Sequence, residues 1–495
     1  MMNKSFKINK TIVVFLLATM FTVMACMDDF LNQKPQGLQT EEVFLITGQD
    51  ALLATTAIYN IFLDWNYNSG GFPLLDIMSD DANKGSNPGD GAFLELFNKF
   101  QFTTSSGDIS RWYSALYKGV RRANIVILKI PPISMDEDLK KRYLGEARFL
   151  RGLFYFDLVR AFGDLPKVTD PNPPRKLSRS PKAEIYSEII IPDLLFAIEN
   201  LPEKSAFPTT DAGRATKGAA KALLAKVHLY QNDFINAEKY AMEVINSGQY
   251  DLEDDFSEAF SLAGQFGVES VFEIGAEQNA GGNQFANTQG VRGNPNRGWG
   301  FNRPSVALIN FFEAGDLRKD ATVIFLGETI DGVFIEGDNS TLDITYADPP
   351  TNSVIKEIET YNQKVWVPGT GTIEEFGYNK RLIRYADVLL MAAEALNENS
   401  KTPEALVPLN KVRERAGLLP IVETDKVMVR QIIADERRAE LAMEGQRFWD
   451  LVRTGKAASV LGPTGFVAGK HELFPIPLSE IDLSEGTMEQ NPNWN

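Results

Sequence analysis

The sequence predicts a mostly α-helical protein in which two helical blocks flank an irregular middle region. Apolar residues recur at helical spacing over about 40–250 and again over about 381–460. Between the blocks, over about 251–380, Gly, Asn, Thr and Pro become frequent, and short apolar alternations such as 271–274 predict a few small strands. With 44% hydrophobic and 23% charged residues in 495, the composition is that of a folded globular protein.

The N-terminus has the pattern of a secretory signal peptide. Lys4, Lys7 and Lys10 precede an almost unbroken apolar run over 11–25, and residues 1–10 contain no acidic side chain. This run is shorter than the roughly 20 residues that a transmembrane helix needs, so it is not a good membrane-spanning anchor. We therefore predict that residues 1–25 are a signal peptide.

The only cysteine of the chain, Cys26, follows this apolar run directly. Its position resembles a lipobox, in which the thiol is acylated after cleavage, although Met24 is atypical two residues before it. The alternatives are a buried free cysteine in an uncleaved leader and ordinary cleavage nearby. Several acyl chains would attach the protein durably to a membrane, with residues 26–39 as a lipidated tether.

Caps and helix-breaking residues divide the first helical block. Thr40 followed by two glutamates is a suitable start, Gly163 ends a long helix, and Pro192 is expected to kink another. Two alanine-rich segments in this block are similar to the close-packed helix pairs of tetratricopeptide repeats. The predicted helices are 40–62, 107–129, 136–162, 180–201, 216–231 and 234–247, and 64–108 is predicted as loop.

The second block is predicted to contain three helices. They cover 382–397, 403–416 and 427–454, after which the chain closes on apolar and proline-rich residues.

Composition excludes several classes of function. A formal net charge of -16 has the wrong sign for binding nucleic acid. A single cysteine excludes an intrachain disulfide and a thiolate metal cluster, and only His228 and His471 are available for imidazole chemistry. His228 lies in an alanine-rich helix, where a core role is expected. With no phosphate-binding loop, dinucleotide fingerprint or EF-hand pattern, we expect neither an enzyme nor a cofactor or metal site.

Several longer motifs occur in a fixed order along nearly the whole mature chain. They are Glu146-Ala147-Arg148-Phe149-Leu150-Arg151, Phe162-Gly163-Asp164-Leu165-Pro166, Arg214-Ala215-Thr216-Lys217-Gly218, Arg384-Tyr385-Ala386-Asp387-Val388, Glu436-Arg437-Arg438-Ala439-Glu440-Leu441, Glu444-Gly445-Gln446-Arg447-Phe448-Trp449-Asp450 and Phe474-Pro475-Ile476-Pro477. Together these motifs resemble the signatures of the SusD (RagB) family of outer-membrane lipoproteins.

The resemblance implies a single SusD-like domain over 40–495, with four tetratricopeptide-like helix pairs as scaffold and an irregular lobe that carries the ligand surface. It also implies a non-enzymatic protein at the outer membrane, facing outward. There it would capture an oligosaccharide or polysaccharide and deliver it to a SusC-like TonB-dependent barrel. Two alternatives stay open on the same scaffold: a lid that binds peptides or protein fragments, and a lid that contacts only the barrel.

The charged residues within these motifs are interpreted as structural. Spacings of three and four residues bring opposite charges together on one face of a helix, where each pair stabilises the helix by about 0.2–0.5 kcal/mol. Others are expected to pair between helices and to fix their packing. The residues concerned are Arg148, Arg151, Arg384, Asp387, Glu436, Arg437, Arg438, Glu440, Glu444 and Arg447.

Ligand contacts are then expected from exposed loops that combine flat aromatic rings with polar side chains, because tryptophan and tyrosine offer large rigid surfaces. Two loops fit this description, 65–81 and 278–303, and a third contains one further tryptophan. Trp65 could instead anchor its helix to the core, and Trp299 could pin a glycine-rich loop. The candidate residues are Trp65, Tyr67, Asp81, Asn283, Arg292, Trp299, Arg303 and Trp366.

Overall fold

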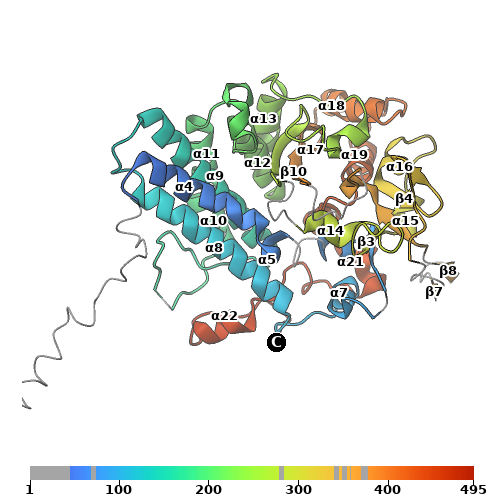
Figure 1. Ribbon diagram of the computed structural model, residues 1–495, viewed down its shortest axis with the longest axis horizontal. Coiled ribbons are helices and arrows are strands. Elements are labelled where there is room, and N and C mark those ends of the chain that lie inside the picture. The colour runs from blue at the N-terminus through green and yellow to red at the C-terminus, as the bar shows by residue number, and fades with distance from the viewer. Residues whose placement is uncertain are drawn as a thin grey trace, which may run out of the picture. The chain divides into compact units, whose positions relative to one another are not determined.

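Long helices that lie side by side form the scaffold of the unit Thr47–Asn495 (Figure 1). The computed structural model describes residues 45–68, 74–87, 89–174, 176–277, 284–338, 345–347, 354–356, 358–368 and 377–494. The predicted signal peptide, Cys26, the tether 26–39 and the candidate Asn283 lie outside the described residues.

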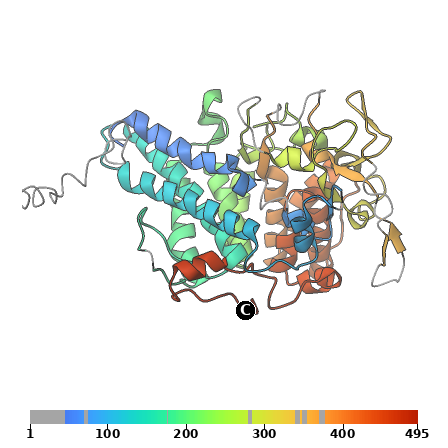
Figure 2. The ribbon, with the colours of Figure 1, turned by 60° about the horizontal axis from the view of Figure 1, so that its bottom comes forward.

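Within the described residues, the scaffold consists of four successive helix pairs. Helix α4 packs with α8, α9 with α11, α12 with α13 and α17 with α18, and each pair contacts the next. In Figure 2 the pairs follow one another from blue through green to orange. Their bounds are α4 Gly48–Tyr59, α8 Gly107–Lys129, α9 Glu137–Phe162, α11 Ile191–Asn200, α12 Lys217–Tyr230, α13 Phe234–Ile245, α17 Tyr385–Glu398 and α18 Thr402–Arg415. The expected mostly helical scaffold is confirmed.

Polar side chains cap several of these helices. The start predicted at Thr40 lies outside the described residues, and α4 begins at Gly48 with Thr47 as its cap. The Asp136 carboxylate accepts hydrogen bonds from two backbone N–H groups in the first turn of α9. Thr216 and Asp233 cap α12 and α13 in the same way. Gly163, with φ 74°, ends α9 in a conformation that glycine adopts without strain.

The segment predicted as one helix over 180–201, with a kink at Pro192, contains a π-helical turn that ends shortly before this proline. Helix α10 (Lys182–Ile185) leads into a π-helical turn, η2 (Tyr186–Ile190), and then into α11. Pro192 lies in the first turn of α11, where its missing N–H is tolerated.

The segment predicted as one helix over 427–454 is instead two, α19 (Lys426–Leu441) and α20 (Arg447–Arg453). Between them the backbone turns through the left-handed region at Met443 (φ 63°) and Gly445 (φ 72°). The intervening Glu444 makes buried ion pairs in this turn. Helical periodicity continued through the break, but the tertiary pairing of Glu444 fixes a different backbone path.

Short strands and helices make up the middle region and the connection after α4. Strand β2 (Ser270–Ile274), predicted at 271–274, pairs antiparallel with β10 (Lys380–Arg384), which extends into the predicted start of a helix at 382. Four further two-stranded antiparallel ladders occur among the described residues: β1 (Ala82–Gly85) with β3 (Phe301–Pro304), β4 (Val323–Phe325) with β9 (Thr360–Asn362), β5 (Thr329–Ile330) with β6 (Val333–Phe334) and β7 (Thr345–Ala347) with β8 (Val354–Lys356).

The segment predicted as loop over 64–108 contains regular structure. After η1 (Asn60–Leu63) it forms short helices that pack on the scaffold, in addition to strand β1. The short helices of the unit are α5 Trp65–Asn68, α6 Leu74–Ile77, α7 Ala92–Asn98, α14 Phe285–Gln289, α15 Val306–Ile309, α16 Arg318–Thr322, α21 Ala457–Leu461 and α22 Leu478–Leu483.

A buried ionic network joins the second helical block to the middle region. Arg384 donates to Glu440 at 2.9 Å and to both carboxylate oxygens of Glu444 at 2.8 Å. It also contacts Glu269, which precedes β2, and Arg318 of α16 lies 3.3 Å from Glu440. All five side chains are at most 10% exposed, and Arg415 and Lys364 pair with the same carboxylates, so the charges are paired within the protein rather than by water.

Other charged motif residues also pair between elements, as predicted. Arg151 of α9 makes a two-pronged contact with Asp193 of α11, at 2.7 and 2.8 Å. Asp387 of α17 accepts from Lys226 of α12 and from Arg437 of α19, both at 3.0 Å. The charges on α19 therefore stabilise its packing against other elements, and the predicted pairing along its own face is not their main role.

The network predicts a pH-dependent effect of Glu440→Gln. Burial alone would raise the pKa of Glu440, but the positive charges of Arg415 and Arg384 lower it to about 2, from an ordinary 4.5. The ionised carboxylate therefore stabilises the fold fully above pH 4.5, and this contribution is lost as the pH falls toward 2. We expect the difference in free energy of unfolding between wild type and variant to shrink by about 1 kcal/mol between neutral pH and about pH 3.5. Urea unfolding at both pH values measures it, and a constant difference would contradict the assignment.

Candidate functional site

Two candidate tryptophans from distant parts of the chain meet at the surface. The ring centroids of Trp65 and Trp299 are 5.7 Å apart at an interplanar angle of 52°. Trp65 is 43% exposed and Trp299 is 39% exposed. We call this pair the tryptophan platform. The two rings contact each other, and each keeps a large part of its surface open to solvent.

The segment before Trp65 holds it in place. The Asp64 carboxylate accepts a hydrogen bond from the backbone N–H of Asn66 at 3.0 Å, which starts α5. The same carboxylate accepts from Lys118 of α8 at 3.2 Å. Helix α5 is thereby fixed to the scaffold at the residue next to Trp65.

The segment that carries Trp299 is held by its backbone and by close packing of glycines. The N–H of Trp299 donates to the carbonyl of Asn287 at 2.8 Å, and Gly300 donates to Gly290 at 3.0 Å. A Cβ added at Gly298 would lie 2.5 Å from the Asn287 carbonyl oxygen, so a side chain does not fit there. This glycine-rich segment therefore lies tightly against the end of α14 and presents the Trp299 ring outward.

Arg292 is partly exposed and lies close to Gly300, the residue after Trp299. Its guanidinium contacts Asp90 at 2.8 Å and Asp338 at 2.9 Å, and it also donates to Ser86. A Cβ added at Gly300 would lie 3.0 Å from the Cβ of Arg292, which places Arg292 against the Trp299 segment. Two carboxylates balance its charge, so it offers donors without an excess positive charge.

The structure places Tyr67 and Asp81 in the interior, which corrects their assignment to a ligand surface. Tyr67 is 1% exposed, packs edge-on against Phe62 and donates to Asp157 at 3.4 Å. Asp81 is fully buried and accepts from Arg438 at 2.7 Å. Tyr67 alternates with Trp65 across the short helix α5, so one ring faces inward and the other outward.

Arg303 and Trp366 are also interior residues rather than surface contacts. Arg303 is 1% exposed and lies over the ring of Tyr361 at 4.6 Å. Trp366 is 9% exposed, and its indole N–H donates to Asp331 at 2.7 Å. The sequence pattern of aromatic and polar residues in loops did not distinguish these buried positions from the exposed ones.

His228 has the core role that the sequence predicts. It is 7% exposed, its ring stacks on Tyr240, and its Nδ1 lies 3.0 Å from Asp233. Burial lowers the pKa of His228.

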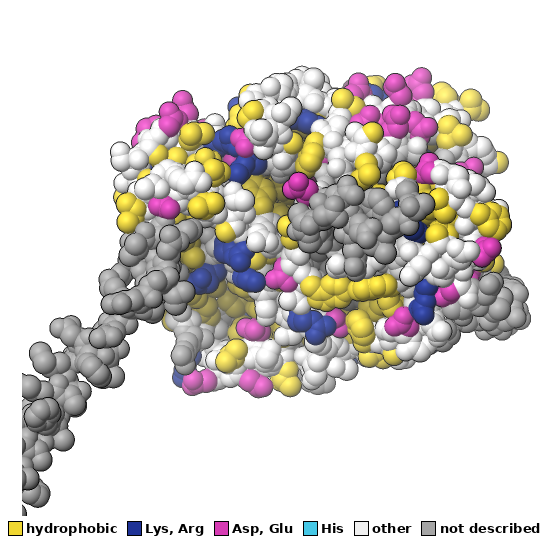
Figure 3. Space-filling model, in the orientation of Figure 1, with side chains coloured by type: hydrophobic (Ala, Val, Ile, Leu, Met, Phe, Trp, Pro, Cys, Tyr) yellow, Lys and Arg dark blue, Asp and Glu magenta, His cyan; other side chains and the backbone are white. Residues whose placement is uncertain are grey.

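A groove opens beside the η1 end of α4, two residues before Trp65. It has a volume of about 580 Å³, and Figure 3 shows this face of the molecule hollowed beside α4. One wall comes from α4 and η1 and the other from the end of β2. Sequence analysis did not single out these residues, although the exposed Leu53 and Leu63 interrupt an otherwise amphipathic pattern. The lining residues are Leu53, Thr56, Ala57, Tyr59, Asn60, Phe62, Leu63, Gly213, Glu273, Ile274 and Gly275.

The described part of the chain contains no cluster of three or more His, Cys, Asp or Glu that could hold a metal ion. In the same residues, every helix is too short or too polar to cross a membrane.

The helical scaffold defines the class of protein, a fold built on tetratricopeptide-like helix pairs, and the exposed tryptophan pair is a candidate binding surface on it. Residues 268–470 match the SusD family, and residues 29–229 match a family described as starch-binding proteins associating with the outer membrane. The chain belongs to the SusD family. SusD-family members are binding proteins, which confirms the expectation that the chain is not an enzyme.

Relatives with known sequences or structures agree over nearly the full length. A SusD-like protein of Formosa agariphila, P2, is 30% identical, with 99% of this chain and 100% of that protein covered. The solved structure of a laminarin-binding SusD-like protein is 30% identical, with a TM-score of 0.76 over 90% of this chain and 100% of that one. Surface glycan-binding protein A of Bacteroides thetaiotaomicron, solved with laminarihexaose, is 25% identical, with a TM-score of 0.75 over 90% and 99%.

Proposed function

We propose that this protein captures a glycan at the bacterial surface on the platform formed by Trp65 and Trp299. The observation that carries the proposal is that two tryptophans from separate segments lie 5.7 Å apart with their rings partly exposed. Aromatic rings stack on the apolar faces of sugar rings, and their rigidity keeps the entropic cost of binding low. Arg292 at the edge supplies hydrogen-bond donors for hydroxyl groups.

The ligand is a neutral glucan of the laminarin type. Two structural relatives, at 30% and 25% identity, are described as laminarin-binding and as a complex with laminarihexaose. The charge of Arg292 is already balanced by Asp90 and Asp338, so a uronate or a sulfate group would gain no free positive charge there.

The protein is held at the outer membrane by lipidated Cys26 and faces the outside of the cell. The basic and apolar leader that ends at Cys26 supports this anchor, and the family description of outer-membrane association agrees with it. Residues 26–39 form the tether and 40–495 the binding domain. A SusC-like TonB-dependent barrel receives the captured glycan, as the resemblance to the SusD family implies.

Affinity gel electrophoresis tests this function. The chain without residues 1–26 retains the whole unit Thr47–Asn495 and is run in gels that contain laminarin, starch, xyloglucan or alginate. We expect retardation by laminarin, no retardation by the anionic alginate, and no cleavage products from any polymer. Retardation by a peptide digest instead would favour the peptide-binding alternative, and retardation by no polymer would contradict glycan capture.

A further inference from the structure

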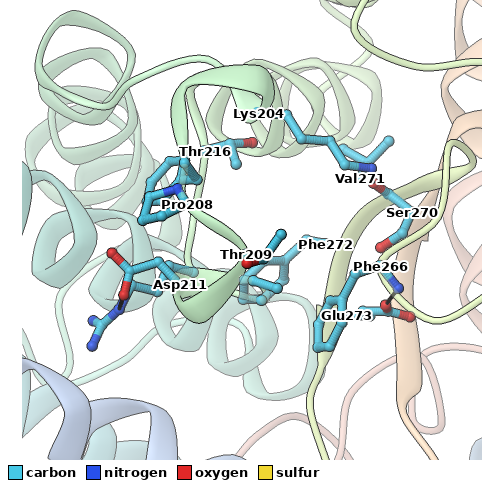
Figure 4. A pocket seen from close by; sticks show the side chains of 14 residues that line it. Lys204, Pro208, Thr209, Asp211, Thr216, Phe266, Ser270, Val271, Phe272 and Glu273 are labelled. Carbon is cyan, nitrogen blue, oxygen red and sulfur yellow. Dashed lines mark hydrogen bonds and ion pairs between the residues drawn. The ribbon is translucent and has the colours of Figure 1, made fainter.

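The groove beside the tryptophan platform continues into a second pocket. This pocket has a volume of about 190 Å³ and lies between the segment 207–216 and strand β2, with Phe266 and Lys204 also in its lining (Figure 4). The two cavities share Gly213 and Glu273 in their linings, so they adjoin at these residues. We call the two adjoining cavities, from η1 to Lys204, the channel.

One wall of this channel ends close to a platform tryptophan. The α4 wall ends at Leu63, and Trp65 follows two residues later. The groove therefore begins within two residues of the platform, on the side of Trp65.

A strained aromatic residue lies where the two cavities meet. Phe266 has φ 56°, a conformation that is costly for a bulky side chain, and its N–H donates to the carboxylate of Glu273. A Cβ added at Gly213 would lie 2.8 Å from the Phe266 ring, and one added at Gly275 would lie 3.2 Å from it. The ring fits against Gly213 and Gly275 because these residues have no Cβ. The partly exposed Phe266 lines the pocket next to Glu273 (Figure 4).

The two carboxylates that line the channel are paired. Glu273 lies 3.2 Å from Arg381, and Asp211 accepts from Arg142 at 2.6 Å. Lys204 donates to the carbonyl of Ser270 at 2.8 Å. The channel therefore combines an apolar floor with paired carboxylates and one lysine that is held by a backbone carbonyl, which suits a chain of uncharged sugars better than an acidic ligand that must displace these pairs.

Arg214, which also lines the pocket, forms an ion pair on the α4 side of the channel. Its guanidinium contacts Glu146 at 2.9 Å and donates to the hydroxyl of Thr56 at 3.0 Å. The hydroxyl of Thr56 and the exposed amide of Asn60 remain on the wall of the groove, where they can meet sugar hydroxyls.

We propose that this channel is a second glycan subsite, in which Phe266 stacks on a sugar several residues along the same neutral polysaccharide chain that is bound on the tryptophan platform. The inference rests on the proposed function and adds that the protein binds an internal stretch of a long chain. Affinity then increases with chain length, because a second contact on the same ligand is made at high effective concentration.

Two variants test the channel without disturbing the platform. Phe266→Gly removes the ring and also relieves the strained backbone, because glycine adopts positive φ freely. Asn60→Trp fills the groove from an exposed position. The control is Leu128→Trp on α8, where the replaced side chain is 55% exposed and lines neither cavity.

Binding of laminaritriose and laminarihexaose to the chain without residues 1–26 is measured by NMR titration and calorimetry, with the melting temperature of each variant. We expect both channel variants to weaken hexaose binding by about tenfold, which is a loss of about 1.4 kcal/mol. Triose binding and folding should stay unchanged. Equal hexaose affinity in wild type and in both variants would overturn the channel subsite while leaving the platform intact. A fall in the melting temperature of Phe266→Gly without a loss of hexaose affinity would also overturn the channel subsite. Wild-type protein that binds neither oligosaccharide would overturn the proposed glucan function and the subsite that depends on it.

Discussion

Replacing Arg384 with methionine is expected to lower the free energy of unfolding by about 3–5 kcal/mol, which is among the largest effects of a single substitution. Arg384 is 1% exposed and contacts the carboxylates of Glu269, Glu440 and Glu444. Methionine fills much of the same volume but removes the cation that joins the three buried carboxylates, which then keep only their ion pairs with Arg318, Lys364 and Arg415. Urea unfolding followed by circular dichroism measures the loss.

The matched control is Arg430→Met on α19. Arg430 also pairs with a glutamate, Glu398, but its side chain is 48% exposed. Exposed ion pairs contribute about 0.2–1 kcal/mol, so this variant should unfold close to the wild type. If Arg384→Met were no more destabilising than Arg430→Met, the buried network would not hold the middle region to the helical scaffold.

The double substitution Trp65→Ala and Trp299→Ala is expected to abolish glycan retardation in affinity gels while the melting temperature changes little. Truncation of a central aromatic residue in a binding site typically costs 2 kcal/mol or more, which is about a thirtyfold loss of affinity for each ring. Both side chains are 39–43% exposed and contact each other, so the core loses little packing when they are removed. Single variants measured alongside show whether each ring contributes.

Two controls separate binding from folding. Phe334→Ala on β6 removes another exposed aromatic ring, 53% exposed, and should bind the glycan normally. Tyr67→Phe, next to the platform but buried, should also bind normally, because it removes only the hydroxyl group that lies 3.4 Å from Asp157. Retained binding in the tryptophan double variant, or equal loss in Phe334→Ala, would contradict the platform.

Local signals in the sequence were sufficient for the helical scaffold. Helix α8 occupies the predicted residues, and α9, α12 and α13 begin within one residue of the predicted starts at 136, 216 and 234, because helix starts depend on neighbouring backbone groups. The break between α19 and α20 was missed. Its cause is the pairing of Glu444 with Arg384, which is 60 positions away, and no local pattern contains that contact.

The sequence by itself determined that this is a mostly helical member of a surface-binding family, with aromatic loop residues as candidates for ligand contact. Only the tertiary structure decided which of those residues reach the surface. Trp65 and Tyr67 are two positions apart, yet one is exposed and the other buried, because α5 packs one face on the scaffold. The meeting of Trp65 with Trp299, and the channel that leads to Phe266, likewise depend on long-range packing. Periodicity specifies a local conformation, whereas a binding surface is formed by segments that the fold brings together.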